Sequence, residues 1–267
     1  MDYITYAVPF FLLALLIELA YGIAIKKNTY RLNDAISNLF MGTLRTANKL
    51  IIIGAAGYVF YIVETKFALW RMDATSAFTW IFAFVIYDFF YYWFHRISHE
   101  RQIFWASHAA HHQSEDYNLS TALRQTGTGA FVSWVFYIPM FVIGIPSYIF
   151  VSVASLNLIY QFWVHSEHIP KLGWYENYFV TASNHRVHHA QNEQYIDKNY
   201  GGVFIIWDRM FGTHKVEDEN EACIYGIRST LNTFNPVWAN LHVYVKIIKE
   251  MRLSRDWKDK LLSLIHI

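Results

Sequence analysis

The sequence predicts an all-α integral membrane protein with four or five transmembrane helices and a cytosolic helical cap that carries a histidine-rich dinuclear metal site. Two observations support this fold class. First, 54% of the residues are hydrophobic, 19% are aromatic and only 16% are charged, whereas a soluble domain has roughly 25% charged residues. Second, eight of the thirteen histidines fall into three short clusters. The net charge of +1 excludes the basic surface that a nucleic-acid partner would require.

Three apolar runs in the first hundred residues are expected to be membrane helices. Residues 3–25 contain one charge, Glu18, and are long enough to cross a bilayer core of about 30 Å. This run lacks a basic start and a small-residue cleavage site, so we expect a membrane helix rather than a secretory signal. Residues 43–63 form the second expected span, and residues 77–94, in which Asp88 is the one charge, form the third.

A fourth apolar run, residues 127–161, contains no Asp, Glu, Lys or Arg. As a single helix it would extend about 50 Å, at about 1.5 Å per residue, which is enough for two crossings. Gly144, Ile145 and Pro146 predict the break between these two crossings because glycine and proline interrupt helices.

Positively charged residues predict the orientation of these helices. Five basic residues flank the first two spans on one side, namely Lys26, Lys27, Arg31, Arg45 and Lys49, and such residues are enriched in cytosolic loops. Counting crossings from that side places all three histidine clusters on the cytosolic face. We therefore expect a protein of the bacterial inner membrane, or of the endoplasmic reticulum in a eukaryote, whose metal site faces the cytosol.

The pattern divides the chain into three regions. Residues 1–75 are expected to hold the N-terminal membrane helices, residues 76–214 the metal-binding domain, and residues 215–267 a polar cytosolic tail. The last seven residues, LLSLIHI, form an abrupt ending that is not typical of a native C-terminus. His266 in this ending is assigned no role.

The three histidine clusters have the spacing of metal ligands on helices. They are HRISH (His95, His99), HAAHH (His108, His111, His112) and HRVHH (His185, His188, His189). Offsets of three or four residues place side chains on one face of a helix, so we expect each cluster to point at one spot. Imidazole is the commonest protein ligand for transition metals. Because one metal takes at most about six ligands, eight imidazoles indicate two metals. The isolated His214 and His242 are expected to be ordinary surface or core residues.

Spacing alone does not choose between zinc and iron, because imidazole binds both. Cys223 is the single cysteine, and this excludes an intrachain disulfide and the cysteine-rich sites that structural zinc usually occupies. The HExxH signature of zinc proteases fails, since His99 and Glu100 are followed by Ile103 where histidine is needed. A transporter would need ligands at mid-membrane depth rather than at helix ends. Two irons with open positions, suited to oxygen activation at a C–H bond, are the favoured interpretation.

The order HxxxH, HxxHH and HxxHH among membrane helices resembles the fatty acid hydroxylase/sterol desaturase superfamily over about residues 80–215. Three segments are also similar to the alkylglycerol monooxygenases, the ether-lipid-cleaving branch. They are HHQSEDYNLSTALRQ (111–125), LNLIYQFWVHSE (156–167) and NHRVHHAQNEQYIDKNYGGVFIIWDRMFGT (184–213). The resemblance implies a diiron domain at residues 76–214, molecular oxygen and a tetrahydrobiopterin reductant. It implies hydroxylation of the ether-linked carbon, with release of an aldehyde and a free glycerol.

The resemblance also assigns residues to roles. It implies that the eight clustered histidines hold the iron ions together with His165, which ends a predicted membrane helix, but not His168. It implies that Glu100 holds the guanidine-like edge of the pterin. Asp88 lies two helical turns before His95 and carries a charge inside a membrane helix, so we expect it to orient an imidazole. Other candidates for that orienting role are Glu100, Asp116, Asn118, Asn184 and Asp208.

These arguments predict a membrane-bound diiron oxygenase that hydroxylates a lipid C–H bond. One alternative is a hydroxylase or desaturase of the same superfamily that acts on a sterol, a fatty acid or a carotenoid. Its electrons would come from a separate protein electron donor, because the sequence contains no fused haem or flavin domain. The alternative from another class is a non-catalytic membrane protein that binds or transports metal. Both oxygenase hypotheses require a lipid substrate and the membrane as partners.

Overall fold

A computed structural model describes residues 2–265 of the chain; Met1 and residues 266–267, which include His266, lie outside the described residues. Within residues 2–265 the ordered elements are all helical and no β-strand is formed. Two isolated antiparallel bridges, Phe179 to Phe204 and Ala190 to Tyr225, are the strand-like contacts of that range. The predicted all-α class is therefore confirmed.

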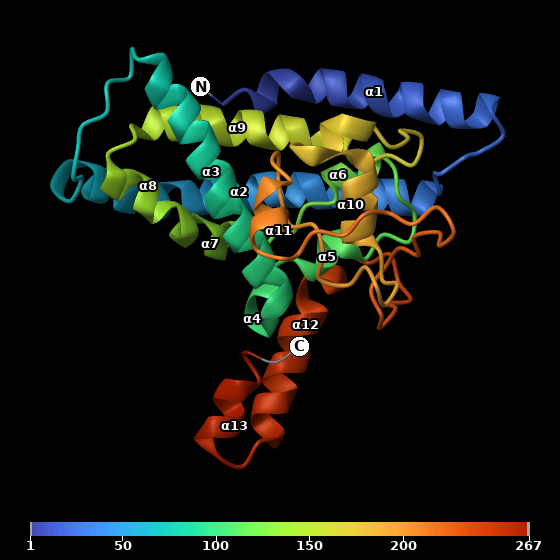
Figure 1. Cartoon of the computed structure of the whole chain (residues 1–267). Helices are drawn as coiled ribbons and strands as arrows, with labels where there is room; N and C mark the ends of the chain where they lie inside the picture. The colour runs from blue at the N-terminus through green and yellow to red at the C-terminus, as the bar shows by residue number, and fades with distance from the viewer. Residues whose placement is uncertain (1, 266–267) are drawn as a thin grey trace.

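Four long helices form the framework in Figure 1. They are α1 (Ile4–Ala24), α2 (Leu32–Lys66), α3 (Ala77–Glu100) and α9 (Ser147–Trp163). Helix α9 packs against both α1 and α3, and α3 runs across the direction shared by α1, α2 and α9 (Figure 1). The apolar core between α3 and α9 is built from side chains of both helices, including Ala83, Ile149 and Val153.

The described chain has two helices, α1 and α3, that are long and apolar enough to cross a membrane. Helix α2 adds a third if its halves, Leu32–Asn48 and Leu50–Lys66, which meet at a bend of 45°, are one span. Many large apolar side chains on α1 and α2 are exposed, among them Leu16, Ile17 and Ile51. Lipid contact accounts for this exposure, because water would make such surfaces unfavourable.

The apolar segment 127–161 is divided where the sequence predicts. Its first part contains α7 (Ala130–Ser133), the 3₁₀ helix η1 (Trp134–Tyr137) and α8 (Ile138–Ile143). Together these run about 21 Å, and α9 runs about 26 Å, at about 1.5 Å per residue. Both are shorter than the bilayer core of about 30 Å. Two or three full-length spans are thus seen where four or five were predicted.

Gly144 makes the break between α8 and α9. Its φ is +100°, and a Cβ added there would lie 1.9 Å from the carbonyl oxygen of Trp70. Only glycine combines this backbone conformation with such a close approach. The Met72 N–H donates to the Gly144 carbonyl at 3.2 Å, and Pro146 then precedes the first residue of α9.

Short helices form a cap around the second half of α3 (Figure 1). They are α4 (Gln102–Trp105), α5 (Ala109–His112), α6 (Leu119–Leu123), η2 (Gly173–Asn177), α10 (Ala182–His189) and α11 (Ile206–Met210). Asn118 caps α6 and Thr181 caps α10, each in a reciprocal capping box. Such caps satisfy backbone N–H groups that a short helix leaves unpaired.

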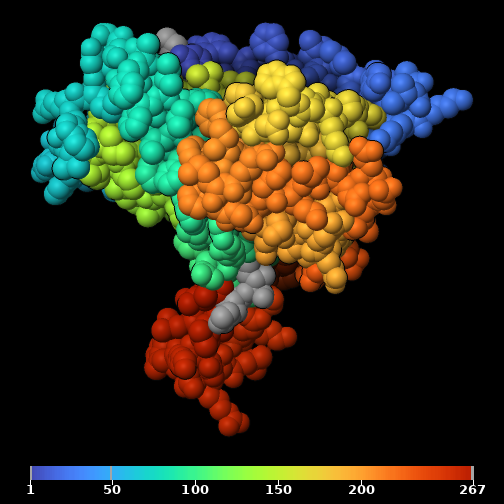
Figure 2. All heavy atoms as spheres, in the orientation of Figure 1, coloured from blue at the N-terminus to red at the C-terminus, as the bar shows by residue number. Residues whose placement is uncertain are grey.

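The last two helices, α12 (Pro236–Leu253) and α13 (Trp257–Leu262), project from the body as a separate lobe (Figure 2). Val243 and Ile247 of α12 are buried against Ala106 and Ala109 at α4 and α5. This packing holds the beginning of the lobe to the helices that carry the second histidine cluster.

Three of the five basic residues that predict the orientation lie in the connection between α1 and α2. They are Lys26, Lys27 and Arg31, and Arg31 is the N-cap that precedes Leu32, the first residue of α2. Arg45 and Lys49 lie inside α2 rather than in a loop. The predicted cytosolic side therefore depends on the first three residues.

Candidate metal centre

Nine histidines converge into two groups that can each hold a metal ion. The first group is His95, His99, His108, His112 and His188, and the second is His111, His165, His185 and His189. Within each group the candidate ligand atoms all lie within 4.8 Å of one another. Seven of the nine side chains are buried, and His99 and His108 are partly buried. All nine residues that the sequence proposed as ligands are in the two groups.

The groups divide the sequence clusters in a way that was not expected. Pairs four residues apart stay together, as His108 and His112 do in the first group and His185 and His189 in the second. Adjacent histidines separate, so that His111 and His112 belong to different groups. Neighbouring residues of a helix point about 100° apart, which sends the two rings to different sites. The expectation that each cluster points at one spot is wrong for the second and third clusters.

Backbone carbonyls orient four of the imidazoles from behind. The Nδ1 atoms of His95, His111, His165 and His188 lie 2.8, 2.9, 2.8 and 2.9 Å from the carbonyl oxygens of Tyr200, Arg124, Gln161 and Lys198, respectively. A carbonyl only accepts, so each Nδ1 must donate, and in the neutral ring Nε2 then carries the free lone pair. Each of these hydrogen bonds therefore prepares Nε2 as a metal ligand.

The inner nitrogens are crowded. In the first group, Nε2 of His108 lies 3.1 Å from Nε2 of both His95 and His112. In the second, Nε2 of His165 lies 3.0 Å from Nε2 of His185 and 3.4 Å from that of His111. Lone pairs facing one another at this separation repel, and a cation between them removes the repulsion.

Further inner nitrogens have no hydrogen-bond partner. Within the described residues, Nε2 of His99, His188 and His189 is buried and unpaired. Buried polar atoms are normally satisfied, so each such atom requires an explanation. Nitrogen lone pairs that have no hydrogen-bond donor are available to coordinate a metal ion. The nine residues therefore fit a pair of transition metals.

Burial also keeps the rings in the protonation state that binds metal. It lowers the pKa of His111 to about 4 and the pKa of His112 and His189 well below the ordinary value of histidine. Desolvation is the main cause, because it disfavours the charged imidazolium. At neutral pH these rings are therefore neutral, and the neutral ring is the form that coordinates a metal.

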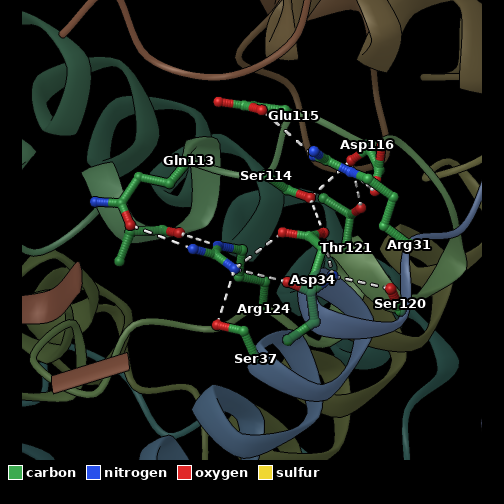
Figure 3. Close-up of polar contacts among 12 residues, drawn as sticks. Arg31, Asp34, Ser37, Gln113, Ser114, Glu115, Asp116, Ser120, Thr121 and Arg124 are labelled. Atoms are coloured by element: carbon green, nitrogen blue, oxygen red, sulfur yellow. Dashed lines mark hydrogen bonds and ion pairs between the residues drawn. The ribbon is translucent and has the colours of Figure 1, made fainter. Parts of the chain in front are cut away.

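Arg124 links the second group to α2. Figure 3 shows the contacts of its side chain with Asp34 and Ser37 of that helix. Its guanidinium donates to the Ala110 carbonyl at 2.7 Å, to Asn38 Oδ1 at 2.9 Å and to Gln113 Oε1 at 3.3 Å. The carbonyl of the same residue accepts the hydrogen bond from His111. One buried arginine thus fixes the positions of α2, the end of α5 and the ring of His111 relative to one another. Sequence reasoning missed it, because a main-chain acceptor leaves no signature in the sequence.

Asp88 acts farther from the metal site than predicted. Its carboxylate accepts from the Val203 and Phe204 N–H groups at 2.8 and 2.9 Å, from Asn157 Nδ2 at 2.7 Å and from Trp207 Nε1 at 3.0 Å. These donors do not include an imidazole, so the expected hydrogen bond from a histidine N–H to the Asp88 carboxylate is not formed. The carboxylate instead holds the segment that follows Tyr200 against α3 and α9.

Asp208 holds the other end of that segment. It accepts from the Tyr200 N–H at 2.7 Å and from the Gly201 N–H at 2.8 Å. Burial raises the pKa of Asp208 to about 6. The carbonyl of Tyr200 is the acceptor for His95, so Asp208 orients that imidazole through one intervening residue, as its candidacy implied.

Glu100 lies at the edge of the site. It pairs with Arg96, whose Nε lies 2.7 Å from Glu100 Oε1, and its side chain is partly exposed. Asp197, which sequence reasoning missed, has an oxygen 3.8 Å from Nδ1 of His99. His168 lies against Tyr21 of α1, outside both groups.

Comparison with known proteins agrees with this geometry. The fatty acid hydroxylase family matches residues 80–213, and the chain belongs to that family. It is 45% identical to alkylglycerol monooxygenase of Homo sapiens over 244 residues, which are 90% of this chain and 54% of that protein. It is 39% identical to alkylglycerol monooxygenase of Xenopus tropicalis over 97% of this chain and 58% of that protein.

A more distant relative is ornithine lipid hydroxylase OlsE of Rhizobium tropici, 28% identical over 54% of this chain and 44% of that protein. The chain spans about half the length of the curated relatives it matches. No solved structure matches it. The predicted resemblance to the superfamily, and to its alkylglycerol monooxygenase branch, is confirmed.

We predict that His165→Ala removes one of two metal ions per chain. The substitution takes a nitrogen from the four-histidine group and leaves the five-histidine group complete. Metal analysis of the purified, iron-loaded protein should fall from about two ions per chain to about one. His168→Ala, three residues away and outside both groups, is the matched control and should retain two. Equal metal content in both variants would contradict the assignment of His165.

Proposed function

We propose that the chain is a membrane-bound diiron oxygenase that uses molecular oxygen to hydroxylate a lipid C–H bond. The finer proposal is that it cleaves the ether bond of alkylglycerols with tetrahydrobiopterin as reductant. The observation that carries the oxygenase proposal is the pair of all-histidine groups at the end of an apolar helix. The 45% identity to an alkylglycerol monooxygenase supports the finer proposal.

The nine histidines would hold two iron ions, in the two groups described above. Iron bound there would supply oxygen activation, and the two electrons that each hydroxylation consumes would come from the reductant. The protein contributes fixed ring orientations through the carbonyls behind His95, His111, His165 and His188. It also contributes a site largely closed to water, since most of the rings are buried. Exclusion of water protects a reactive oxidant from side reactions.

The chemistry of an ether substrate explains how hydroxylation leads to cleavage. Replacing a hydrogen on the carbon next to the ether oxygen by hydroxyl gives a hemiacetal. The hemiacetal breaks its bond to the ether oxygen, and the hydroxyl proton passes to that oxygen. The products are a fatty aldehyde and free glycerol. The apolar outer faces of α1 and α2 support a membrane location, where such a lipid would be available.

A purified, iron-loaded full chain in lipid membranes should convert a 1-O-alkylglycerol to the fatty aldehyde. Conversion should require both oxygen and a tetrahydropterin, and the measurement is aldehyde release by mass spectrometry. A His189→Ala chain serves as the inactive control. Oxidation that proceeds only with a protein electron donor would replace the alkylglycerol proposal by the hydroxylase or desaturase alternative. Absence of any lipid oxidation by protein with two irons would overturn the oxygenase proposal.

We propose that Glu100 binds the pterin, since its side chain is partly exposed and it directly follows His99 of the five-histidine group in the sequence. Replacing Glu100 by Gln should raise the apparent KM for the pterin about 10-fold or more, because hydrogen bonds to charged groups contribute roughly 1.5–3 kcal/mol. Iron content should stay at the wild-type value. The exposed Glu219 provides the control variant, Glu219→Gln. Loss of iron with an unchanged pterin KM would assign Glu100 to the support of His99 instead.

We propose that the metal centre faces the cytosol, on the basis of Lys26, Lys27 and Arg31. A cysteine replacing the exposed Asn220, in a Cys223→Ser background, should resist an impermeant thiol reagent added to sealed cells. It should react after the cells are permeabilised. A cysteine at Asp73, which precedes α3 at its far end, should react from outside and provides the control. The opposite labelling pattern would reverse the orientation.

A further inference from the structure

Helix α2 carries a positive charge that no acidic side chain of the described residues neutralises. Arg45 lies in the Leu32–Asn48 half of the bent candidate span. Within the described residues, its guanidinium has neither a carboxylate partner nor a hydrogen bond to another group. A guanidinium stays protonated in proteins, and an ionised group inside a membrane segment is a functional candidate by default. Arg31 and Arg124, by contrast, are each paired with aspartate.

Three tyrosines lie near this charge. Tyr87 and Tyr91 of α3 and Tyr137 of η1 lie within electrostatic range of the Arg45 guanidinium. The rings of Tyr87 and Tyr137 stack with centroids 4.7 Å apart and planes 8° apart. The start of α7 is also close, because a Cβ added to Gly129 would lie 3.5 Å from Arg45 Nη1. The cluster therefore occupies the junction of α2, α3 and the α7–η1 segment.

The cluster borders both histidine groups. The ring of Tyr91 packs against His95 of the five-histidine group, with centroids 5.3 Å apart. Arg45 lies within electrostatic range of His111 of the four-histidine group. The side chain of Arg45 is partly accessible, so a ligand can reach it. An unpaired donor thus lies beside the candidate metal centre, on the side of the apolar helices.

We propose that Arg45, together with Tyr91 and Tyr137, binds an oxygen atom of the lipid substrate next to the carbon that is hydroxylated. The guanidinium has five N–H donors and no acceptor, so its complement is an acceptor oxygen. In a neutral lipid this is an ether or hydroxyl oxygen of the polar head. The inference rests on the proposed oxygenase function and adds a reason for its substrate selectivity.

The physical consequence is discrimination against lipids that lack the oxygen. A site built to hydrogen-bond a substrate oxygen rejects the analogue without it, because the polar group of the site is then left unpaired. A purely hydrocarbon chain would leave Arg45 unpaired in an apolar environment. A glycerol ether would satisfy it.

Stability distinguishes a binding role from a structural one. A charge without a partner in an apolar environment is unfavourable to the fold, so its replacement by an apolar side chain of similar length should preserve or raise stability. A residue that holds the helices together would show the opposite effect. Arg45→Met therefore separates the two roles.

The test compares wild type, Arg45→Met, Tyr137→Phe and Arg71→Met, each as the full iron-loaded chain in nanodiscs. Arg71 is an exposed arginine between α2 and α3, and it controls for loss of one positive charge. Binding of radiolabelled 1-O-hexadecylglycerol and of hexadecane is measured by equilibrium dialysis, with iron content and Tm alongside. Arg45→Met should weaken hexadecylglycerol binding about 10- to 100-fold, the effect of losing a charged hydrogen bond. Tyr137→Phe should weaken it less.

Hexadecane binding, iron content and Tm should not fall in Arg45→Met, and Arg71→Met should match wild type throughout. Unchanged hexadecylglycerol binding by Arg45→Met would overturn the inference, as would a wild-type chain that does not prefer hexadecylglycerol to hexadecane. A lowered Tm with loss of iron would assign Arg45 a structural role. Binding requires no turnover, so a chain that binds hexadecylglycerol through Arg45 but oxidises no lipid would retain the oxygen site and lose the proposed function.

Discussion

The inward orientation of nine imidazole rings is the constraint on which the rest of this structure depends. Their inner nitrogens approach to 3.0–3.4 Å, where neutral lone pairs repel unless a cation lies between them. The protein maintains this arrangement by hydrogen bonds on the opposite side of four rings, each to a backbone carbonyl. Backbone acceptors suit this purpose because they are themselves held by the surrounding helices and segments.

Much of the surrounding structure serves to place those carbonyls. Asp208 holds the backbone of Tyr200, and Asp88 holds Val203, three residues farther along the same segment. Arg124 joins α2 to the end of α5, and its own carbonyl meets His111. These charged side chains are buried but paired or hydrogen-bonded, as buried charges must be if they are not to destabilise the fold. Each of these side chains supports the geometry of the metal site without being a metal ligand itself.

The charged side chains near the metal site therefore fall into two groups, those with hydrogen-bond or ion-pair partners and one without. Around the histidines, aspartates and arginines are satisfied by backbone groups or by each other, and their effect is rigidity. Arg45 departs from this pattern, since it lies inside α2 with tyrosines and His111 as neighbours and no carboxylate partner among the described residues. In the proposed function, its position between the apolar helices and the metal groups is where the polar part of a lipid would meet the metal centre. A rigid metal site and an unpaired donor beside it are both expected of an oxygenase that selects its substrate.

The sequence by itself determined the helical class, the break at Gly144 and the eight clustered histidines, because helix periodicity, glycine conformation and ligand spacing are local properties. His165 came from family resemblance alone, since an isolated histidine has no spacing to identify it. Only the tertiary structure decided how adjacent histidines divide between two sites, and which carbonyl each ring meets. The same holds for Asp88, which helix spacing placed beneath His95 but whose carboxylate binds a segment more than a hundred residues away. Partners this distant along the chain are set by packing, which no local pattern encodes.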